Sequence, residues 1–310
     1  MSVVQTKVTY ITIAEEDDGQ RIDNFLVKKL KGLPKSHLYK LLRKGEVRVN
    51  KKRIKPEYRL QVGDSLRLPP MKLLPEKAKV APNAHVLAML SNGILFENDD
   101  FWVINKPSGI AVHGGSGINY GVVEAMRALY PKHKQLDLAH RLDRDTSGCL
   151  VIAKKRSSLK LLHDLFRDRR IKKFYWALTA GHWKNSELTV DLPLMRYELQ
   201  SGERMVKVKP EGKPSKTKFQ VIDRFDQAEL VSAELCTGRT HQIRVHAAER
   251  EHPIAGDNKY GDKEFNQIMK KFGVKRLFLH ARHLTIPWSE QTIEVNAPLN
   301  AEMQRVLEKL

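Results

Sequence analysis

Six short runs of strand-like character between residues 101 and 286 constrain the fold of this chain more than any other feature. They read FWVINKP, CLVIAKK, KKFYWALTAG, TKFQVIDRF, AELVSAEL and LFLHARHLTI, and they are rich in β-branched and aromatic residues. Fewer segments show helical spacing: GVVEAMRALY, SSLKLLHDLFRD and HQIRVHAAERE, the last with Thr240 as its expected N-cap. Because the strands outnumber the helices and do not alternate with them, the pattern favours an α+β fold with a central mixed, mainly antiparallel sheet over a doubly wound fold.

The N-terminal part of the chain predicts a separate small α/β module over residues 19–68. Apolar residues repeat twice at helical spacing, and we expect Ser36 to cap the second helix and Gly45 to end it. The stretches VRVN and RLQVGDSLRL then predict a small β-hairpin. Residues 69–92, which are rich in Pro and Lys, are expected to form a linker, and residues 93–310 one larger domain.

The charge of the chain is strongly positive and argues for a polyanionic partner. There are 55 Lys and Arg residues against 36 Asp and Glu, a net charge of +19 that favours nucleic acid. Residues 19–59 hold 14 basic and 3 acidic residues, so more than half of the excess lies in the small module. A membrane surface is the rival, but no apolar run approaches the roughly 18 residues that a span needs. The expected RNA contacts in the module are Lys40, Arg43, Lys44, Lys51, Lys52 and Arg53.

The segment HRLDRDTSG places Asp143 between Arg141 and Arg144, just before an apolar run. Neighbouring guanidinium groups favour an ionised carboxylate, which suits a nucleophile, or a base for acidic protons, better than a general acid. The structural alternative is a salt-bridged turn, for which Thr146 to Gly148 supply the chemistry. Spacing alone favours the turn.

A second cluster of residues favours the interpretation of Asp143 as part of a reaction centre over that of a salt-bridged turn. The segment CTGRTHQIRVH carries Arg239 and Arg244 together with His241 and Gln242 at an expected helix start. A helix N-terminus with arginines is a ready anion site. The cluster could therefore hold an RNA phosphate or pair with Asp143.

No arrangement of residues predicts a metal or cofactor site. The close histidine pairs, H-Q-I-R-V-H and H-A-R-H, lack the form of known zinc motifs, and Cys149 and Cys236 stand outside any C-x-x-C pair. Both cysteines read as buried free thiols of a reducing compartment, and the first residues do not resemble a secretory signal. We therefore expect a cytoplasmic protein. A long apolar heptad pattern is also lacking, which favours a monomer.

Several segments together resemble the RluA-type family of RNA pseudouridine synthases. They are HRLDRDTSG, NKPSGIAVHGG, KFYWALTAG, LCTGRTHQIRVH, PIAGDNKYGD and LFLHARHL. The segment from DGQRIDNFL to SHLYKLLRKGEVRVN resembles the S4-like RNA-binding module that often precedes that domain. The resemblance implies a pseudouridine synthase fold and the conversion of uridine in RNA to its C-glycoside isomer without metal or cofactor. It points to large-subunit (23S) ribosomal RNA.

The resemblance also implies roles for particular residues. Asp143 matches the essential aspartate of the family, which attacks the ribose, attacks the base or removes a ribose proton; the sequence does not decide among these routes. Arg141 would enter the RNA where the target base leaves the stack, at a cost of a few kcal/mol that protein contacts must offset. Tyr175 would stack on the flipped uracil. Arg244 is expected to form the ion pair with Asp143, with Arg239 as the alternative.

Two other classes of function remain open on the residues. One is an RNA-binding or ribosome-assembly protein that keeps the fold without chemistry, against which Asp143, Tyr175 and Arg244 argue. The other is a hydrolase that uses Asp143 and a metal ion, but the sequence lacks a second carboxylate cluster with ligand spacing.

Overall fold

The computed structural model describes residues 4–30, 32–73, 81–115 and 118–310. The chain forms two compact units, which divide between Val80 and Ala81. Of the linker expected at 69–92, residues 74–80 lie outside the described residues, and helix α3 (Ala84–Ser91) occupies much of the remainder.

The smaller unit packs two helices on a four-stranded sheet whose order is β2-β5-β3-β4. Strand β2 lies ahead of residue 19, so the sheet extends beyond the module that we drew from the sequence. Its elements are β1 (Val4–Gln5), β2 (Thr9–Thr12), η1 (Glu15–Asp17), α1 (Ile22–Lys29), α2 (Lys35–Lys44), β3 (Arg48–Val49), β4 (Lys52–Arg53), β5 (Ser65–Leu68) and β6 (Lys72–Leu73).

Helix α2 begins and ends for different reasons. Gly45 ends it in the left-handed region at φ 69°, as we expected. A Cβ on Gly45 would also collide with the side chain of Arg53, which crosses the helix end and donates to the Lys44 carbonyl oxygen at 2.7 Å. The expected Ser36 cap is wrong, because the helix already starts at Lys35 after Pro34, whose fixed φ suits this position.

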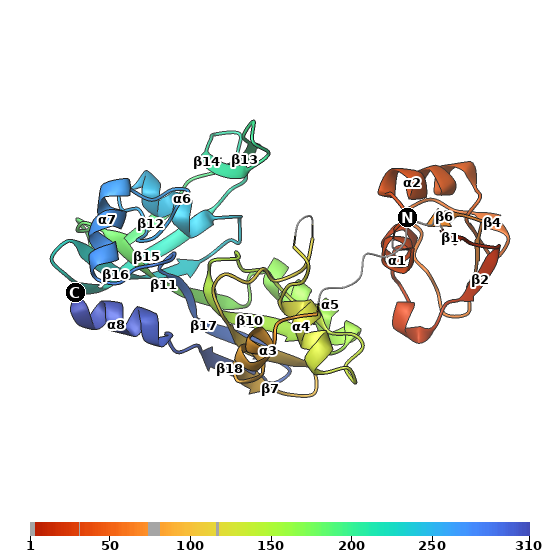
Figure 1. The fold of residues 1–310 in the computed structure, drawn as a ribbon, viewed down its shortest axis with the longest axis horizontal. Helices are drawn as coiled ribbons and strands as arrows, with labels where there is room; N and C mark the ends of the chain where they lie inside the picture. Colours follow the sequence, from red (N-terminus) through yellow and green to blue (C-terminus); the bar gives the residue numbers. More distant parts are fainter. Residues whose placement is uncertain (1–3, 31, 74–80, 116–117) are drawn as a thin grey trace. The chain divides into compact units, whose positions relative to one another are not determined.

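The larger unit is built on a ten-stranded sheet with helices on both faces (Figure 1). The six strand-like runs form β8, β10, β11, β15, β16 and β17, which confirms their prediction, and α4 and α5 confirm two of the helices. After α3 the elements are β7 (Ile94–Glu97), β8 (Phe101–Lys106), α4 (Val122–Leu129), β9 (Asp137–Leu138), β10 (Ser147–Ala153), α5 (Arg156–Arg167), β11 (Lys172–Ala180), β12 (Glu187–Asp191), β13 (Leu194–Glu198), β14 (Arg204–Val208), β15 (Lys216–Arg224), β16 (Ala228–Leu235), α6 (Gln242–Glu249), α7 (Lys263–Lys271), β17 (Leu279–Trp288), β18 (Gln291–Asn296) and α8 (Ala301–Lys309).

Alternation along the strands divides the interior of this unit between two faces of the sheet. Ala177 of β11 packs in one cluster with residues of α4, α5 and α6, whereas the next residue, Leu178, packs in another with α7 and α8. Figure 1 shows α7 and α8 near the C-terminus of the chain, beside β11 and β16, and α4 and α5 beside β10. The sheet order β12-β15-β16-β11-β17-β10-β8-β7 contains one parallel pair, β10 with β17, within the described strands, so the mixed, mainly antiparallel sheet is confirmed.

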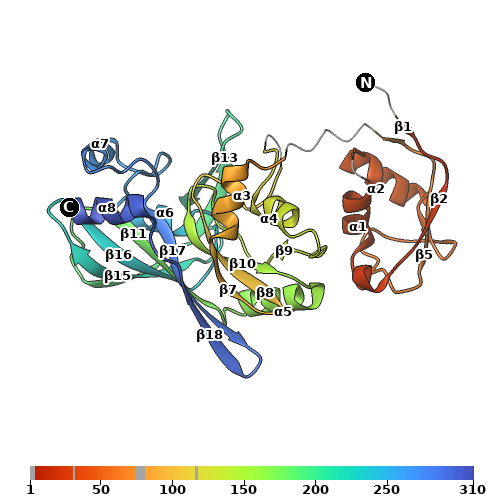
Figure 2. The same ribbon diagram turned by 60° about the horizontal axis from the view of Figure 1, so that its bottom comes forward.

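That parallel pair brings distant segments together in the middle of the sheet. Ala281 of β17 is the register partner of Gly148 on one side and of Tyr175 on the other. The register shifts between Phe174 and Tyr175, whose partners on β17 are His283 and Ala281, and irregularities of this kind can re-aim side chains near functional sites. The C-terminal half of β17 pairs with β18, and the two strands extend from the sheet as a two-stranded ribbon (Figure 2).

Gly148 permits this approach, and its replacement gives a test. Its φ is +108°, and a Cβ there would lie 2.3 Å from the Ala281 carbonyl oxygen. We predict that Gly148→Ala lowers the unfolding free energy of the larger unit by about 2–4 kcal/mol, through backbone strain and overpacking.

Gly202→Ala is the control, because Gly202 also has positive φ (+79°) but the nearest atom to its Cβ is 3.9 Å away. It should cost only about 1–2 kcal/mol. Denaturation followed by tryptophan fluorescence reports on this unit alone, since all four tryptophans lie in it, at positions 102, 176, 183 and 288. Equal losses in the two variants would contradict the close packing at Gly148.

Candidate active site

Asp143 lies in a turn just before β10, and residues of segment 105–109 form hydrogen bonds to the main chain of that turn. The Thr146 amide donates to the Asp143 carbonyl oxygen at 3.2 Å. The Gly109 amide donates to the Arg144 carbonyl oxygen at 2.9 Å, and the Ser108 hydroxyl to that of Asp145 at 2.6 Å. The turn is therefore anchored through the main chain of residues 143–146, next to the Asp143 carboxylate, whose side chain is 31% exposed.

Lys106 is a buried part of this anchor. Its ammonium donates to the carbonyl oxygens of Pro107, Ile110 and Arg144 at 2.8, 2.9 and 3.0 Å. Burial lowers the pKa of Lys106 to about 7, against the opposing attraction of Asp145 and Asp143. Lys106 thus ties the Asp143 turn to β8.

Arg244 of α6 carries the positive charge that faces Asp143. Its Nη1 lies 3.6 Å from Asp143 Oδ2, and its Nε and Nη2 donate to the two carboxylate oxygens of Asp257, both at 2.7 Å. Burial favours the neutral form of both groups, but their hydrogen bonds outweigh it, so the pKa of Asp257 is lowered and that of Arg244 raised. The pair therefore stays charged and holds Arg244 against Asp143.

The sequence neighbours of Asp143 do not supply this charge. Arg144 pairs instead with Asp145 at 3.2 Å, and Arg141 is exposed. Among the described residues, Arg244 is the arginine within 4 Å of Asp143, whereas Arg239 is exposed and donates to the Pro214 carbonyl oxygen. The carboxylate is thus supported from α6, about 100 residues further along the chain.

Tyr175 lies beside this group on β11. Only 6% of the residue is exposed. Burial raises the pKa of Tyr175, and the negative charge of Asp143 adds to the rise. The hydroxyl therefore stays protonated near neutral pH and can donate a hydrogen bond or present an aromatic face, but it cannot serve as a base.

The start of α6 differs from the sequence expectation. Thr240 is not the cap: His241 occupies the N-cap position at φ 53°, and the Thr240 hydroxyl accepts a hydrogen bond from Arg196. Gln242 is buried. Its side-chain oxygen accepts a hydrogen bond from the Thr237 hydroxyl at 2.7 Å, and its side-chain nitrogen donates to the Lys216 carbonyl oxygen at 2.9 Å. This placement favours a structural role over the RNA contact that we expected of Gln242.

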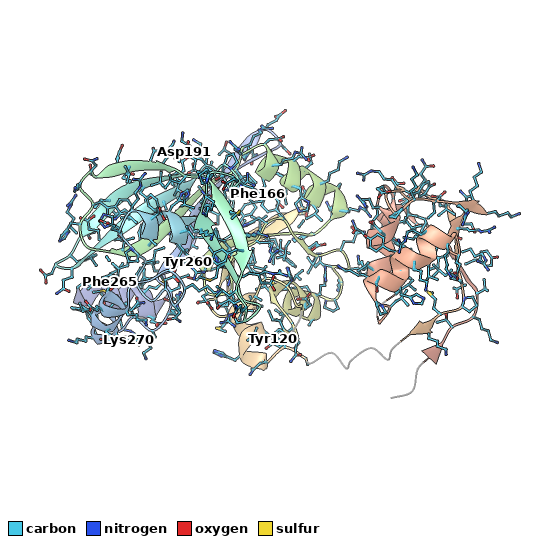
Figure 3. All side chains as sticks on the ribbon, turned by 90° about the horizontal axis from the view of Figure 1, so that it is seen from above. Tyr120, Phe166, Asp191, Tyr260, Phe265 and Lys270 are labelled. Atoms are coloured by element: carbon cyan, nitrogen blue, oxygen red, sulfur yellow. The ribbon has the colours of Figure 1, made fainter. Side chains whose placement is uncertain are left out.

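His241 lies with Asp143 rather than on open surface. Its Nε2 is 3.8 Å from Asp143 Oδ2, and its Nδ1 is 2.8 Å from the hydroxyl oxygen of Tyr260. In Figure 3 the label of Tyr260 lies between those of Phe265 and Phe166, within the larger unit.

In the smaller unit, the six expected RNA contacts form one basic patch, defined as Lys40, Arg43, Lys44, Lys51, Lys52 and Arg53. All six are exposed, and among the described residues none of them takes part in an ion pair. Positions 40, 43 and 44 share one face of α2. Arg53, by its bond to the Lys44 carbonyl oxygen, joins the β3–β4 hairpin to that helix end.

Three residues of the site were not found from the sequence: Lys106, Asp257 and Tyr260. Each lies in a segment that carried the family resemblance, NKPSG or PIAGDNKYGD. That signal marked the segments but not what these side chains contact. The described residues contain no group of three or more His, Cys, Asp or Glu able to hold a metal ion, and no described helix is long and apolar enough to cross a membrane.

Comparison with known proteins defines the class. The model of the RNA pseudouridylate synthase family matches residues 100–249, and that of the S4 domain matches residues 20–66. The human protein RNA pseudouridylate synthase domain containing 4 has a similar structure, with a TM-score of 0.62 and 28% identity over 73% of this chain and 95% of that one. The chain belongs to the RNA pseudouridine synthase family, and it is an isomerase with an N-terminal S4 domain.

Full-length relatives narrow the comparison. A protein of Haemophilus influenzae named ribosomal large subunit pseudouridine synthase C is 51% identical over 311 residues, 99% of this chain and 97% of that protein. The protein of the same name in Escherichia coli strain K12 is 50% identical over 315 residues, 100% of this chain and 99% of that protein. The family and the fold expected from the motifs are confirmed.

The Arg244–Asp257 pair can be tested by removing one partner. We predict that Asp257→Ala lowers the unfolding free energy by about 3–5 kcal/mol, because it leaves a buried guanidinium without its carboxylate. Denaturation followed by tryptophan fluorescence measures the change. Asp191→Ala is the control: Asp191 is 61% exposed and pairs with Lys216 at 3.4 Å on the surface, where such pairs contribute little. Similar losses in both variants would contradict the role given to Asp257.

Proposed function

We propose that this protein converts uridines of large-subunit ribosomal RNA, the 23S RNA, to pseudouridine, with Asp143 as the essential carboxylate. The observation that supports it best is the position of Asp143: half-buried in an anchored turn, beside Tyr175, and 3.6 Å from an arginine fixed by Asp257. The names of the full-length relatives support the choice of RNA.

Exposure separates the two carboxylates that contact Arg244. The Asp143 side chain is 31% exposed and the Asp257 side chain 1%. A nucleotide can therefore reach Asp143 but not Asp257. Attack on the ribose, attack on the base and removal of a ribose proton all need an ionised Asp143, and the Arg244 guanidinium faces this carboxylate at 3.6 Å.

The surrounding residues support extraction of the target base. We assign Arg141, which is exposed in the same segment as Asp143, to the space that the flipped nucleotide leaves in the RNA. We assign the ring of Tyr175 to stacking on the uracil. Such contacts offset the few kcal/mol that unstacking costs. We assign Arg239, which is exposed before α6, to contact with an RNA phosphate.

The remaining assignments concern RNA affinity, the domain boundaries, the oligomeric state and the location of the protein. We assign the basic patch to phosphate contacts outside the reaction centre, and we keep residues 19–68, 69–92 and 93–310 as the proposed RNA-binding module, linker and catalytic domain. A monomer that needs no metal or cofactor and works in the cytoplasm remains our prediction from the sequence.

The essential role of Asp143 is tested by Asp143→Asn, which removes the charge and keeps the size. We predict that pseudouridine formation on unmodified ribosomal RNA falls at least about 1,000-fold, as for other residues that act directly in the reaction, while RNA affinity stays within about threefold. Single-turnover assays and binding titrations measure the two effects.

Asp145→Asn is the matched control, since Asp145 lies two residues away and pairs with Arg144 instead. It should react at a rate near that of the wild type. Substantial turnover by Asp143→Asn would remove Asp143 from the reaction. Loss of folding in that variant would instead favour a structural role.

The basic patch is tested by its effect on salt dependence. Each phosphate contact contributes about 0.7–0.9 to the slope of log affinity against log salt. Changing Lys40, Arg43 and Lys44 together to Gln should therefore make the slope shallower by roughly 2. The control changes Lys263, Lys270 and Lys271 of α7 to Gln, which removes the same charge from exposed positions elsewhere. Equal slopes in the two triple variants would mean that the patch does not contact RNA.

A further inference from the structure

His241 is almost enclosed, and one of its ring nitrogens faces the Asp143 carboxylate. Its side chain is 13% exposed, and Nε2 lies 3.8 Å from Asp143 Oδ2. This distance is longer than a hydrogen bond. Catalytic contacts are often loose in the absence of substrate and shorten in the complex. The sequence suggested an RNA contact for His241, but its low exposure and its two neighbours give it a different task.

Tyr260 determines which nitrogen of His241 carries the proton. The Val206 amide of β14 donates to the Tyr260 hydroxyl oxygen at 2.9 Å, and that oxygen lies 2.8 Å from His241 Nδ1. An amide can only donate, so the hydroxyl proton is free to point at Nδ1. This arrangement satisfies all three groups when Nδ1 is an acceptor, and the proton of a neutral imidazole is then on Nε2.

The other tautomer is disfavoured on both sides of the ring. With the proton on Nδ1, the Tyr260 hydroxyl proton would lose its acceptor, and a lone pair on Nε2 would face the Asp143 carboxylate. Burial lowers the pKa of His241, with Arg244 acting in the same direction and Asp143 against it, so the neutral ring is the relevant form near neutral pH. The Nε2–H group therefore points at the carboxylate.

The same tyrosine also contacts the second positive group at the site. Its ring lies 5.1 Å from the Arg244 guanidinium and 5.5 Å from the His241 ring. The β13–β14 hairpin, which stands out beside α6 in Figure 1, holds Tyr260 through Val206 and is joined to the Thr240 hydroxyl through Arg196. Lys259, next to Tyr260, adds an ion pair to Glu203 of the hairpin, with 2.5 Å between Nζ and Oε1.

We propose that His241 is a positioning residue for Asp143: its Nε2–H is a second donor to Oδ2 beside Arg244, and Tyr260, held by β14, fixes the tautomer that makes this possible. The proposal rests on the proposed role of Asp143. It gives the hairpin a function inside the reaction centre, because the backbone of β14 sets the orientation of a donor on the reacting carboxylate.

Two amide substitutions separate this role from a structural one. In Gln the side-chain NH2 can lie near the place of Nε2, whereas in Asn it lies near that of Nδ1. Asn tolerates the left-handed backbone of position 241 better than Gln. A purely structural role therefore favours His241→Asn, and a donor role favours His241→Gln.

We expect single-turnover rates at saturating ribosomal RNA to fall about 10–100-fold in His241→Ala and His241→Asn, the range typical for residues that orient a reacting group. His241→Gln should stay within about threefold of the wild type, and RNA affinity should change less than about threefold in all three. An Asn variant that equals or exceeds Gln overturns the proposal. So does a series in which affinity falls and the saturated rate does not, because that pattern identifies an RNA contact.

The role of Tyr260 is tested in two backgrounds. Tyr260→Phe keeps the ring over Arg244 and removes the hydroxyl, so we expect a rate about tenfold lower in the wild-type background. In the His241→Gln background the same change should have little effect, because an amide has no tautomer to fix, and this non-additivity is the signature of action through His241. Equal losses in both backgrounds would overturn the tautomer role.

Asp143→Asn, measured alongside, keeps the two proposals distinguishable. If Asp143→Asn is inactive and the His241 series is flat, the positioning role fails and the proposed function stands. If Asp143→Asn turns over, the proposed role of Asp143 in the reaction fails, and the positioning role fails with it.

Discussion

The bidentate ion pair between Arg244 and Asp257 is the interaction on which the reaction centre depends. Both side chains are nearly excluded from solvent, at 6% and 1% exposure, and two 2.7 Å hydrogen bonds join them. Placing two charges in such an environment costs several kcal/mol per ion, so a pair of this kind is a weak source of stability. What it supplies is a guanidinium that cannot turn away from Asp143. The partly exposed carboxylate thereby keeps a positive neighbour even when RNA phosphates approach.

The sheet explains how residues so far apart in sequence meet. Gly148 and Tyr175 both pair with Ala281, so β10, which follows the Asp143 turn, and β11 lie on opposite sides of β17. Lys106 fixes that turn to β8, while α6 brings in Arg244. The β13–β14 hairpin adds a further layer through Tyr260. The site is thus a rigid arrangement of main-chain anchors around one reachable carboxylate.

Repeating patterns made the elements of the fold predictable. The six predicted strands of the larger unit and the helices α4 and α5 were found because apolar periodicity records which face is buried, and Gly45 was found because only glycine readily ends a helix in the left-handed region. The Ser36 cap was wrong for a local reason, because Pro34 starts α2 earlier. The Thr240 cap was wrong because of a tertiary contact, in which Arg196 donates to the Thr240 hydroxyl. Local rules cannot anticipate such partners.

The chemistry of the candidate site was only partly contained in the sequence. Asp143 and Arg244 were proposed together from motif resemblance, and the structure places them 3.6 Å apart. The arginines adjacent to Asp143 suggested its charge partners, but Arg144 binds Asp145. Asp257, Lys106 and Tyr260 act through contacts between segments, which no spacing along the chain reveals.

The most direct measurement is on the double variant Arg244→Met, Asp257→Leu, which replaces the buried pair by apolar side chains of similar size. Such replacements are often neutral or stabilising, whereas single removals are costly. We predict that the double variant unfolds at higher denaturant than Asp257→Leu alone, by tryptophan fluorescence, yet forms pseudouridine at least about 100-fold more slowly than the wild type, as befits loss of a group that orients the reacting carboxylate. A double variant that is stable and forms pseudouridine at the wild-type rate would contradict the claim that this pair holds Asp143 ready for reaction.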